Sequence, residues 1–447
     1  MSEKIENVVV ISADSLREKD LKLSEEAFPF LQEEMERPGD YYSNASWTVP
    51  AHASIFSGKL VSEHGTNTQN MYFDSENKLE KYFNSKDFDT VLISENNLLT
   101  TGLGFSSDFD EAVEITRKKG KLWNEDSWRV EDRFSGRWSK FFWRTISTGD
   151  LESISSFSKT VLEKFDLKEY GEKYNPTYSN HTIEEILESV NGSGKKFVFS
   201  NLMPTHTDYT FKEEDKEEFL SDVDADKIRE VTSVTDLHEV IEEKGELSKE
   251  DIDILENSYK ASIRYLDRIL RELYEKLPRN TLLLVIGDHG EVIGEHPFRD
   301  ELFVEHHFGT FEELVEVPFR YKFKGDQSLN LDFEASDHSR FLNIIKTVFR
   351  DEGMEDGFPI FCEYYGKSSI ASFFGESYPD EFSELYERES FSVISGEFKL
   401  DMASDGTKLW ELGEYESEEV DNPEKIEEMN SKIPFVLRTI LEEKNLF

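Results

Sequence analysis

The chain has 447 residues, a formal net charge of −44 at pH 7 and one cysteine, Cys362. The acidic balance argues against nucleic acid as a partner, because phosphate backbones are bound by basic surfaces, and a single cysteine excludes an internal disulfide. No segment reaches the roughly 20 apolar residues of a membrane span, and the first residues lack a signal peptide's basic and apolar regions. We therefore expect a cytoplasmic protein with no transmembrane segment, whose charge resembles that of a halophilic surface.

The first predicted element is a strand near residues 7–12, which is continuous in apolar residues and runs into Asp14 and Ser15. A continuous apolar run indicates a strand that is buried on both faces, as in a parallel sheet. Open α/β sheets bind ligands at the carboxyl ends of such strands. Asp14 is therefore a candidate site residue, although a lone Asp at a strand end is usually a turn or helix cap.

A short helix is predicted between Thr48 and Gly58, because Pro50 suits the first helical turn and Gly58 suits the end. Thr48 would then lie just outside the helix. Its hydroxyl would face free backbone N–H groups and the positive end of the dipole, which favours an alkoxide or a bound sulfate or phosphate. The same position is also an ordinary one for an N-capping Thr, so both interpretations stay open at this point.

The central part of the chain alternates strands near 90–94, 196–202, 281–287 and 317–322 with helices such as 253–276 and 337–350. The strand at 281–287 ends directly in Asp288 and His289. At the carboxyl ends of two strands, Asp14, Asp288 and His289 could meet at one metal ion, with oxygen and imidazole ligands and no thiolate.

One segment is basic, in contrast to the acidic chain as a whole. Between Arg117 and Arg144 lie nine basic and four acidic residues, together with four of the six tryptophans. Tryptophan and arginine together suit a sugar ring, a lipid headgroup surface or a protein partner, and a helical cap packed on the acidic body is the alternative. We interpret the segment at about 115–150 as an insertion on the substrate side.

The last segment predicts a helix from about Pro423 to Glu443. We expect one large catalytic domain over residues 1–380 and a small α+β subdomain over residues 381–447.

Several short motifs, taken in their order along the chain, resemble those of the sulfatase family of the alkaline phosphatase superfamily. The matching residues are Asp14-Ser15, Thr48-Val49-Pro50-Ala51-His52 with Gly58, and Asp288-His289-Gly290-Glu291. Two C-terminal segments, Ser395-Gly396-Glu397-Phe398-Lys399-Leu400 and Lys408-Leu409-Trp410-Glu411-Leu412, resemble the family's closing hairpin. The resemblance spans nearly the whole chain. It implies an α/β, alkaline phosphatase-like sandwich, in which helices flank a large mixed, mostly parallel sheet.

Two departures from the family pattern bear on the chemistry. Thr48 stands where sulfatases carry the Cys or Ser that becomes formylglycine, and the resemblance is therefore to the Thr-nucleophile branch of phosphodiesterases and phosphoglycerol transferases. The resemblance implies one divalent metal ion (Mn, Ca, Mg or Zn) held by Asp14, Thr48, Asp288 and His289. The Asp-x-x-x-His segment of a second zinc site is not found in the sequence.

The histidines supply the remaining candidates. His206, in a loop similar to the family's His-x-Pro-Tyr, is the first candidate to protonate the leaving group, and His307 is the second. His306 is adjacent, could exchange roles with His307, and is grouped with Asn97 as substrate-binding. His52 stands in place of the sulfatase Arg and is expected to position the nucleophile. Three further histidines are expected to be structural: His64, His296 and His338.

These observations predict a metal-dependent hydrolase or transferase of phosphate or sulfate esters, with Thr48 as nucleophile and phosphodiesters preferred. The substrate would be a small anionic ester or a glycan- or lipid-linked ester. One alternative is a sulfuric ester hydrolase. Another is a non-catalytic protein that keeps the fold and uses the site only to hold an anion.

Overall fold

The computed structural model describes residues 5–446 apart from 24–26, 77, 101, 116–176, 208, 233–246, 297–303, 327–328, 352, 354–356, 367–386, 405, 413–416 and 445. The basic, tryptophan-rich segment predicted at about 115–150 lies outside the described residues, as does the predicted domain boundary near residue 380. Among the described residues, no helix has both the length and the apolar content needed to cross a bilayer.

A six-stranded sheet with the order β4-β3-β5-β1-β6-β9 forms the centre of the molecule. Its strands are β1 (Asn7–Ala13), β3 (Phe88–Ser94), β4 (Glu111–Glu114), β5 (Lys195–Leu202), β6 (Thr281–Gly287) and β9 (Phe319–Lys324). All neighbouring pairs are parallel except β6 and β9. Every residue of β1 and of β6 is buried, as their continuous apolar sequences predict.

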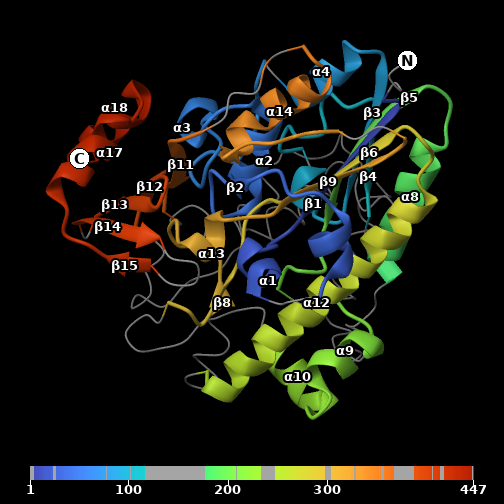
Figure 1. The fold of residues 1–447 in the computed structure, drawn as a ribbon, viewed down its shortest axis with the longest axis horizontal. Helices are drawn as coiled ribbons and strands as arrows, with labels where there is room; N and C mark the ends of the chain where they lie inside the picture. Colours follow the sequence, from blue (N-terminus) through green and yellow to red (C-terminus); the bar gives the residue numbers. More distant parts are fainter. Residues whose placement is uncertain are drawn as a thin grey trace, which may run out of the picture.

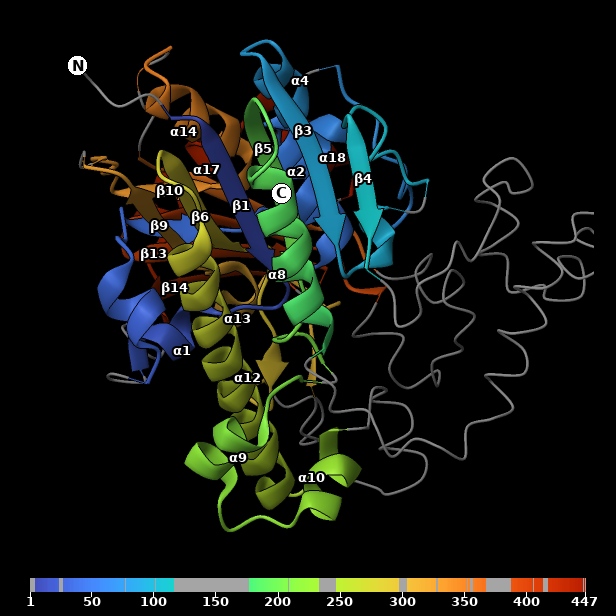
Figure 2. The same ribbon diagram turned by 90° about the vertical axis from the view of Figure 1, so that its right-hand side faces the viewer.

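Helices cover both faces of this sheet, and alternate residues of each strand divide the core into two layers. Val9 and Ile11 face a layer that holds α8 (Thr177–Val190) and α12 (Lys249–Lys276). Val8 and Val10 face the layer of α2 (Thr48–Ser57), α4 (Leu79–Asn84) and α14 (Phe341–Val348). Figure 2 shows α8 and α12 in front of the sheet, with α2 and α14 behind it. The result is the predicted alkaline phosphatase-like α/β sandwich.

Shorter elements connect these layers. They are α1 (Glu18–Leu23), the π-helical turn Phe30–Glu34, β2 (Asp40–Tyr42), α3 (Val61–His64), the 3₁₀ turn Asn97–Leu99, α9 (Glu213–Leu220), α10 (Ala225–Thr232), β7 (Val292–Ile293), β8 (Val304–Glu305), α13 (Glu312–Val315), β10 (Ala335–Asp337) and the 3₁₀ turn His338–Arg340. β2 pairs with β10 in parallel, and β7 pairs with β8 antiparallel.

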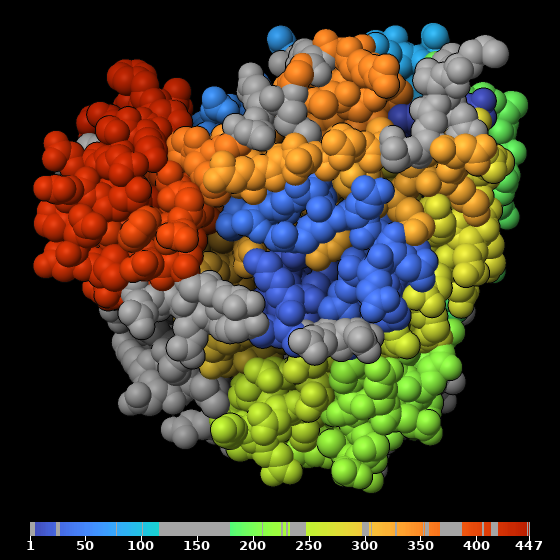
Figure 3. Space-filling model, viewed as in Figure 1, coloured from blue at the N-terminus to red at the C-terminus, as the bar shows by residue number. Residues whose placement is uncertain are grey.

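The C-terminal part forms a second, antiparallel sheet beside the main body (Figures 1 and 3). Its five strands are β11 (Ile360–Tyr364), β12 (Ser390–Ser395), β13 (Phe398–Ala403), β14 (Gly406–Leu412) and β15 (Ser417–Glu419). β11 precedes residue 381, so this sheet begins earlier in the chain than the subdomain that the sequence predicts. The two segments that resemble the closing hairpin are the turn from β12 into β13, at 395–400, and the later part of β14, at 408–412.

Several predicted boundaries differ from the structure. The single helix predicted over 423–443 is two helices, α17 (Pro423–Ser431) and α18 (Phe435–Glu443), because Pro434 cannot donate within a continuous helix and instead precedes α18. The helix predicted over 253–276 begins at Lys249, where Ser248 and Asp251 form a capping box. The strand predicted over 317–322 is displaced by two residues, to Phe319–Lys324.

Candidate metal and nucleophile site

The register of the central sheet brings the two acidic strand ends together. β1 and β6 pair in parallel so that Ala13 lies opposite Gly287, and the next residues are Asp14 and Asp288. A tight turn follows β1, where Ser15 has a left-handed φ of 62°. Tyr259 of α12 braces this turn, because its hydroxyl donates to Ser15 O at 2.7 Å. Both carboxylates are therefore placed by rigid elements rather than by a free loop.

Each carboxylate has one oxygen that is bound within the protein and one that is not. Asp14 Oδ2 accepts from Asn96 Nδ2 at 3.0 Å and from Asn201 Nδ2 at 3.3 Å. Asp288 Oδ1 accepts from the backbone N–H groups of Ser15 and His289. Within the described chain, Asp14 Oδ1 and Asp288 Oδ2 are buried and have no hydrogen-bond partner. Two buried carboxylate oxygens without donors fit a cation, because an anion buried without a partner is costly.

His289 supplies an imidazole to the same point. Its Nδ1 donates to Gly290 O at 2.8 Å, which leaves Nε2 as the nitrogen that can ligate a metal. Nε2 lies 3.4 Å from Asp14 Oδ1 and 3.6 Å from Asp288 Oδ2. The ligand atoms of Asp14, Asp288 and His289 all lie within 4.8 Å of one another. The donor set of two carboxylates and one imidazole suits a divalent ion such as Mn²⁺ or Zn²⁺.

Thr48 completes this group from the start of α2. Its Oγ1 lies 3.3 Å from His289 Nε2 and 3.5 Å from Asp14 Oδ2, and its side chain is buried. The expected N-cap position is wrong, however: Trp47 is the N-cap, and Thr48 is the first helical residue. The hydroxyl still lies at the positive end of the helix dipole, in the first turn. Gly58 ends α2 in the left-handed conformation, as predicted.

The pKa values of the clustered residues reflect their burial and the charges of their neighbours. Burial and the adjacent Asp14 raise the pKa of Asp288 to about 7. Burial alone would lower the pKa of His289, but the charges of Asp288 and Asp14 outweigh it and raise the value to about 9. Burial also opposes ionisation of Asp14, yet His206, His289 and Asn96 together hold its pKa well below the usual range. A divalent cation would relieve the repulsion between the two carboxylates.

His52 lies one turn after Thr48 and connects the helix to the sheet. Its Nδ1 donates to Thr48 O at 2.8 Å, and its Nε2 lies 3.0 Å from the hydroxyl of Ser12 in β1. Burial lowers the pKa of His52 to about 4, so the ring is neutral at pH 7. His52 thus links the first turn of α2 to β1, and its role in positioning the nucleophile stays a prediction.

His206, His306 and His307 occupy different places around the cluster. The ring of His306 stacks on that of His289 at 4.7 Å, and the ring of His206 meets His306 at 5.3 Å. His307 instead lies 5.7 Å from the ring of Trp47. The structure thus places His306, rather than His307, directly against the predicted metal ligand. Burial would lower the pKa of His206, but the charges of Asp14 and Glu291 outweigh it and raise the pKa.

Residues that the sequence interpretation did not select also form the site. Asn96 and Asn201 hold Asp14 Oδ2, whereas Asn97, the predicted substrate residue, is exposed in the 3₁₀ turn that follows β3. Thr205 donates to Asp14 O at 2.6 Å. The sequence did contain a signal for Asn96 and Asn201, because both lie at or just after the carboxyl ends of neighbouring strands. Asn96 is two residues beyond Ser94, the last residue of β3, and Ser94 pairs with Asn201 in β5.

The three histidines that are expected to be structural contact residues other than Asp14, Thr48, Asp288 and His289. His338 contacts Gly287 O at 3.0 Å, and His64 contacts the Ser54 hydroxyl at 3.1 Å. His296 lies 2.8 Å from Glu313. Burial lowers the pKa values of His338 and His64 to about 3.

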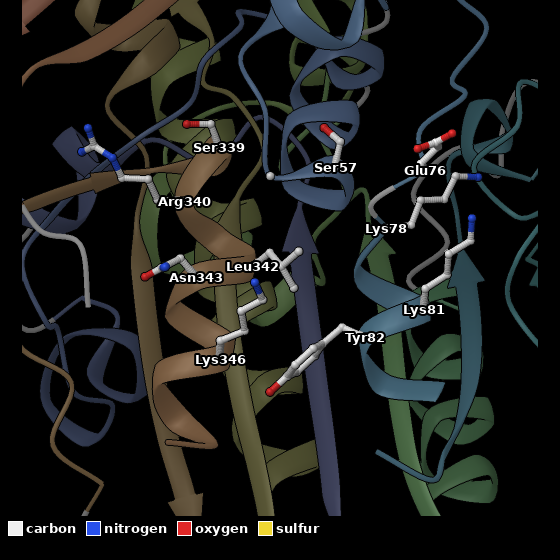
Figure 4. Close-up of a pocket in the computed structure, with 11 residues that line it drawn as sticks. Ser57, Glu76, Lys78, Lys81, Tyr82, Ser339, Arg340, Leu342, Asn343 and Lys346 are labelled. Atoms are coloured by element: carbon white, nitrogen blue, oxygen red, sulfur yellow. The ribbon is translucent and has the colours of Figure 1, made fainter. Parts of the chain in front are cut away.

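A separate cavity of about 480 Å³ opens between the end of α2, α4 and α14 (Figure 4). It is lined by more basic than acidic residues, but Arg340 donates to Gly357 O and Pro359 O, and Lys78 donates to Gly104 O. Ser57 lines the cavity from the opposite end of α2 to Thr48. None of Asp14, Thr48, Asp288 and His289 lines this cavity.

Solved structures of other proteins have a similar fold. A phosphonate monoester hydrolase of Agrobacterium radiobacter is similar at a TM-score of 0.58 and 13% identity, covering 91% of this chain and 89% of that one. BT1596, a 2-O GAG sulfatase, has a TM-score of 0.56 and 12% identity, covering 99% and 92%. A protein of the alkaline phosphatase superfamily from Vibrio parahaemolyticus has a TM-score of 0.50 and 12% identity, covering 100% and 89%.

The family model named Sulfatase matches residues 6–328, and the chain therefore belongs to the sulfatase family. A search of curated proteins finds no match. The solved structures establish the fold, and the family supports an ester hydrolase or transferase.

Proposed function

We propose that this protein is a metal-dependent hydrolase or transferase of phosphate or sulfate esters, which uses Thr48 as its nucleophile and prefers phosphodiesters. The carrying observation is the position of Thr48 Oγ1, buried in the first turn of α2 and 3.3 Å from His289 Nε2, beside two carboxylate oxygens that lack donors. The proposed metal ligands are Asp14, Asp288 and His289, with Thr48 completing the site. A bound divalent cation would lower the pKa of the Thr48 hydroxyl and neutralise a non-bridging oxygen of the ester.

The proposed reaction has two displacements. Thr48 enters the cycle as an alkoxide whose proton has passed to solvent. Its Oγ1 forms a bond to phosphorus, while the bond to the leaving oxygen breaks and its electron pair stays on that oxygen. A histidine then supplies the proton that the leaving oxygen needs, and His206 and His306 are the candidates next to the cluster. In the second displacement, water or an acceptor alcohol gives a proton back to the histidine, attacks phosphorus and expels Thr48 Oγ1.

The preference for diesters rests on charge. Among the described residues, the hydrogen-bond and ion-pair partners of Asp14, Asp288 and His289 include no lysine or arginine. The described chain also holds one candidate metal cluster of this kind. A diester carries one negative charge, whereas a monoester dianion needs more neutralisation in the transition state.

The test compares kcat/KM for 4-nitrophenyl sulfate, a 4-nitrophenyl phosphomonoester and a 4-nitrophenyl phosphodiester, with Mn²⁺, Mg²⁺, Ca²⁺ and Zn²⁺ supplied in turn. Thr48→Ala should abolish turnover and Thr48→Ser should retain part of it, because serine keeps the hydroxyl. Mass spectrometry of a slow-substrate reaction should locate the added group on the peptide that contains Thr48.

Each other outcome selects a different function. A clear preference for the sulfate ester would identify a sulfuric ester hydrolase. Binding of phosphate or sulfate without turnover of any ester would identify an anion-binding protein. Wild-type turnover in Thr48→Ala would refute the nucleophile.

A further inference from the structure

Glu291 lies two residues after the proposed ligand His289, and its carboxylate bridges two loops that carry histidines. The side chain is fully buried. Its Oε1 accepts from His306 Nδ1 at 2.8 Å, and its Oε2 accepts from Thr207 Oγ1 at 2.8 Å. Thr207 follows His206 in the loop after β5, and His306 follows β8. One carboxylate thus joins the two loops beside the cluster.

The carboxylate also fixes the orientation of the His306 ring. Because Nδ1 of His306 donates to Glu291, this nitrogen carries a proton and is turned toward the carboxylate. His206 is arranged in the same way, since its Nδ1 donates to Thr207 O at 3.0 Å. Glu291 therefore acts on His306 directly and on His206 through Thr207.

The backbone around Glu291 is fixed independently of these bonds. Arg17, which is buried, donates through Nη1 to Glu291 O at 3.0 Å. Gly290 N donates to Leu314 O at 2.8 Å. Loss of the Glu291 carboxylate should therefore release the two histidine loops without displacing the Asp288-His289 strand end.

We propose that Glu291 is a positioning residue, which holds His306 and the His206 loop at a fixed separation beside Thr48 and thereby sets proton delivery to the leaving oxygen. This inference rests on the proposed function. It assigns Glu291 neither to the metal nor to the substrate. The described cluster of ligand atoms within reach of one another comprises Asp14, Asp288 and His289 without Glu291.

The test uses a series of aryl esters whose leaving phenols differ in pKa, from 4-nitrophenol to phenol. Good leaving groups need little protonation, and general acids contribute about 10²- to 10⁴-fold where protonation is needed. Glu291→Gln should lower kcat for the phenyl ester by about 100-fold and for the 4-nitrophenyl ester by no more than about threefold. The metal content and KM should stay close to those of the wild type.

Glu295→Gln is the matched control, because Glu295 lies four residues further on and pairs with Arg17 and Lys19 rather than with a histidine. It should leave the dependence on the leaving group unchanged. A double-mutant cycle with His306→Ala adds a second test: the losses of phenyl ester turnover from the two substitutions should be less than additive, because part of the effect of Glu291 acts through His306.

A uniform loss across the ester series, or a loss of metal from Glu291→Gln, would overturn the positioning role. Additive losses in the cycle would overturn it as well. These failures differ from failure of the proposed function, which would show as unchanged turnover in Thr48→Ala.

Discussion

Asn96 should control the affinity of the site for its metal, although its side chain is not among the proposed ligands. Asn96 Nδ2 donates to Asp14 Oδ2 at 3.0 Å and so directs the other oxygen, Oδ1, toward His289. A hydrogen bond to a charged group contributes about 1.5–3 kcal/mol, which corresponds to about 10- to 100-fold in binding. Asn201 still holds Oδ2 from 3.3 Å after the change, so the lower end of that range is expected.

The experiment measures dissociation constants for Mn²⁺ and Zn²⁺ by competition with a chelator. Asn96→Ala should weaken binding by about 10-fold. The Asn96 side chain also accepts from Leu98 N at 3.1 Å and caps the following 3₁₀ turn. Asn96→Ser separates the two effects, because serine retains a capping oxygen but is too short to reach Asp14. We expect the serine variant to bind metal as weakly as the alanine variant.

Asn97→Ala is the matched control, since Asn97 is adjacent and exposed. It should bind metal like the wild type. Equal weakening in the Asn96 and Asn97 variants would show that the turn as a whole, rather than the bond to Asp14, determines affinity. Wild-type affinity in both Asn96 variants would refute the argument that the orientation of Asp14 matters.

Two further predictions concern the scaffold. Gly290→Ala should sharply lower the unfolding temperature and the metal content, because a Cβ there would lie 1.7 Å from Glu313 O. Gly353→Ala is the control and should change neither, because its Cβ would meet nothing within 4 Å. A normal melting curve for Gly290→Ala would contradict this close packing. Glu80→Gln should stabilise the protein at pH 8 relative to pH 5. Burial raises the pKa of Glu80 from 4.5 to about 7, so stability present below pH 4.5 is lost as the pH rises through 7, by roughly 3 kcal/mol for the full shift. Urea unfolding of both proteins at the two pH values measures the difference, and an equal effect of the substitution at both would rule the shift out.

The sequence predicts the sheet and the acidic strand ends well, because both depend on short-range patterns. Continuous apolar runs mark β1 and β6 as buried strands, and parallel pairing then requires the residues after them to meet at one edge. Pro434 is also a local signal for a helix boundary, although the predicted helix over 423–443 runs across it. The local signals of Pro50 and Gly58 place α2 to within one residue.

The residues around the cluster could not be selected in the same way. Asn96 and Asn97 are adjacent residues of the same type, and so are His306 and His307. The sequence pattern cannot separate such neighbours, because the conformation of the turn decides which of the two side chains points inward. The prediction of Asn97 as a site residue fails to identify the contact that Asn96 makes with Asp14. Glu291 was visible in the Asp288-His289-Gly290-Glu291 block, but its partners come from loops about 84 and 15 residues away in the chain.

The site divides into two parts that are held by different means. Thr48, Asp14 and Asp288 are placed by α2 and by the register of β1 and β6, which the buried core supports on both faces. His206 and His306 lie in connecting segments, which the carboxylate of Glu291 joins by its bonds to Thr207 and His306. Substitutions in those segments should therefore change which leaving groups are accepted while preserving the metal site, because loops tolerate change better than packed strands do.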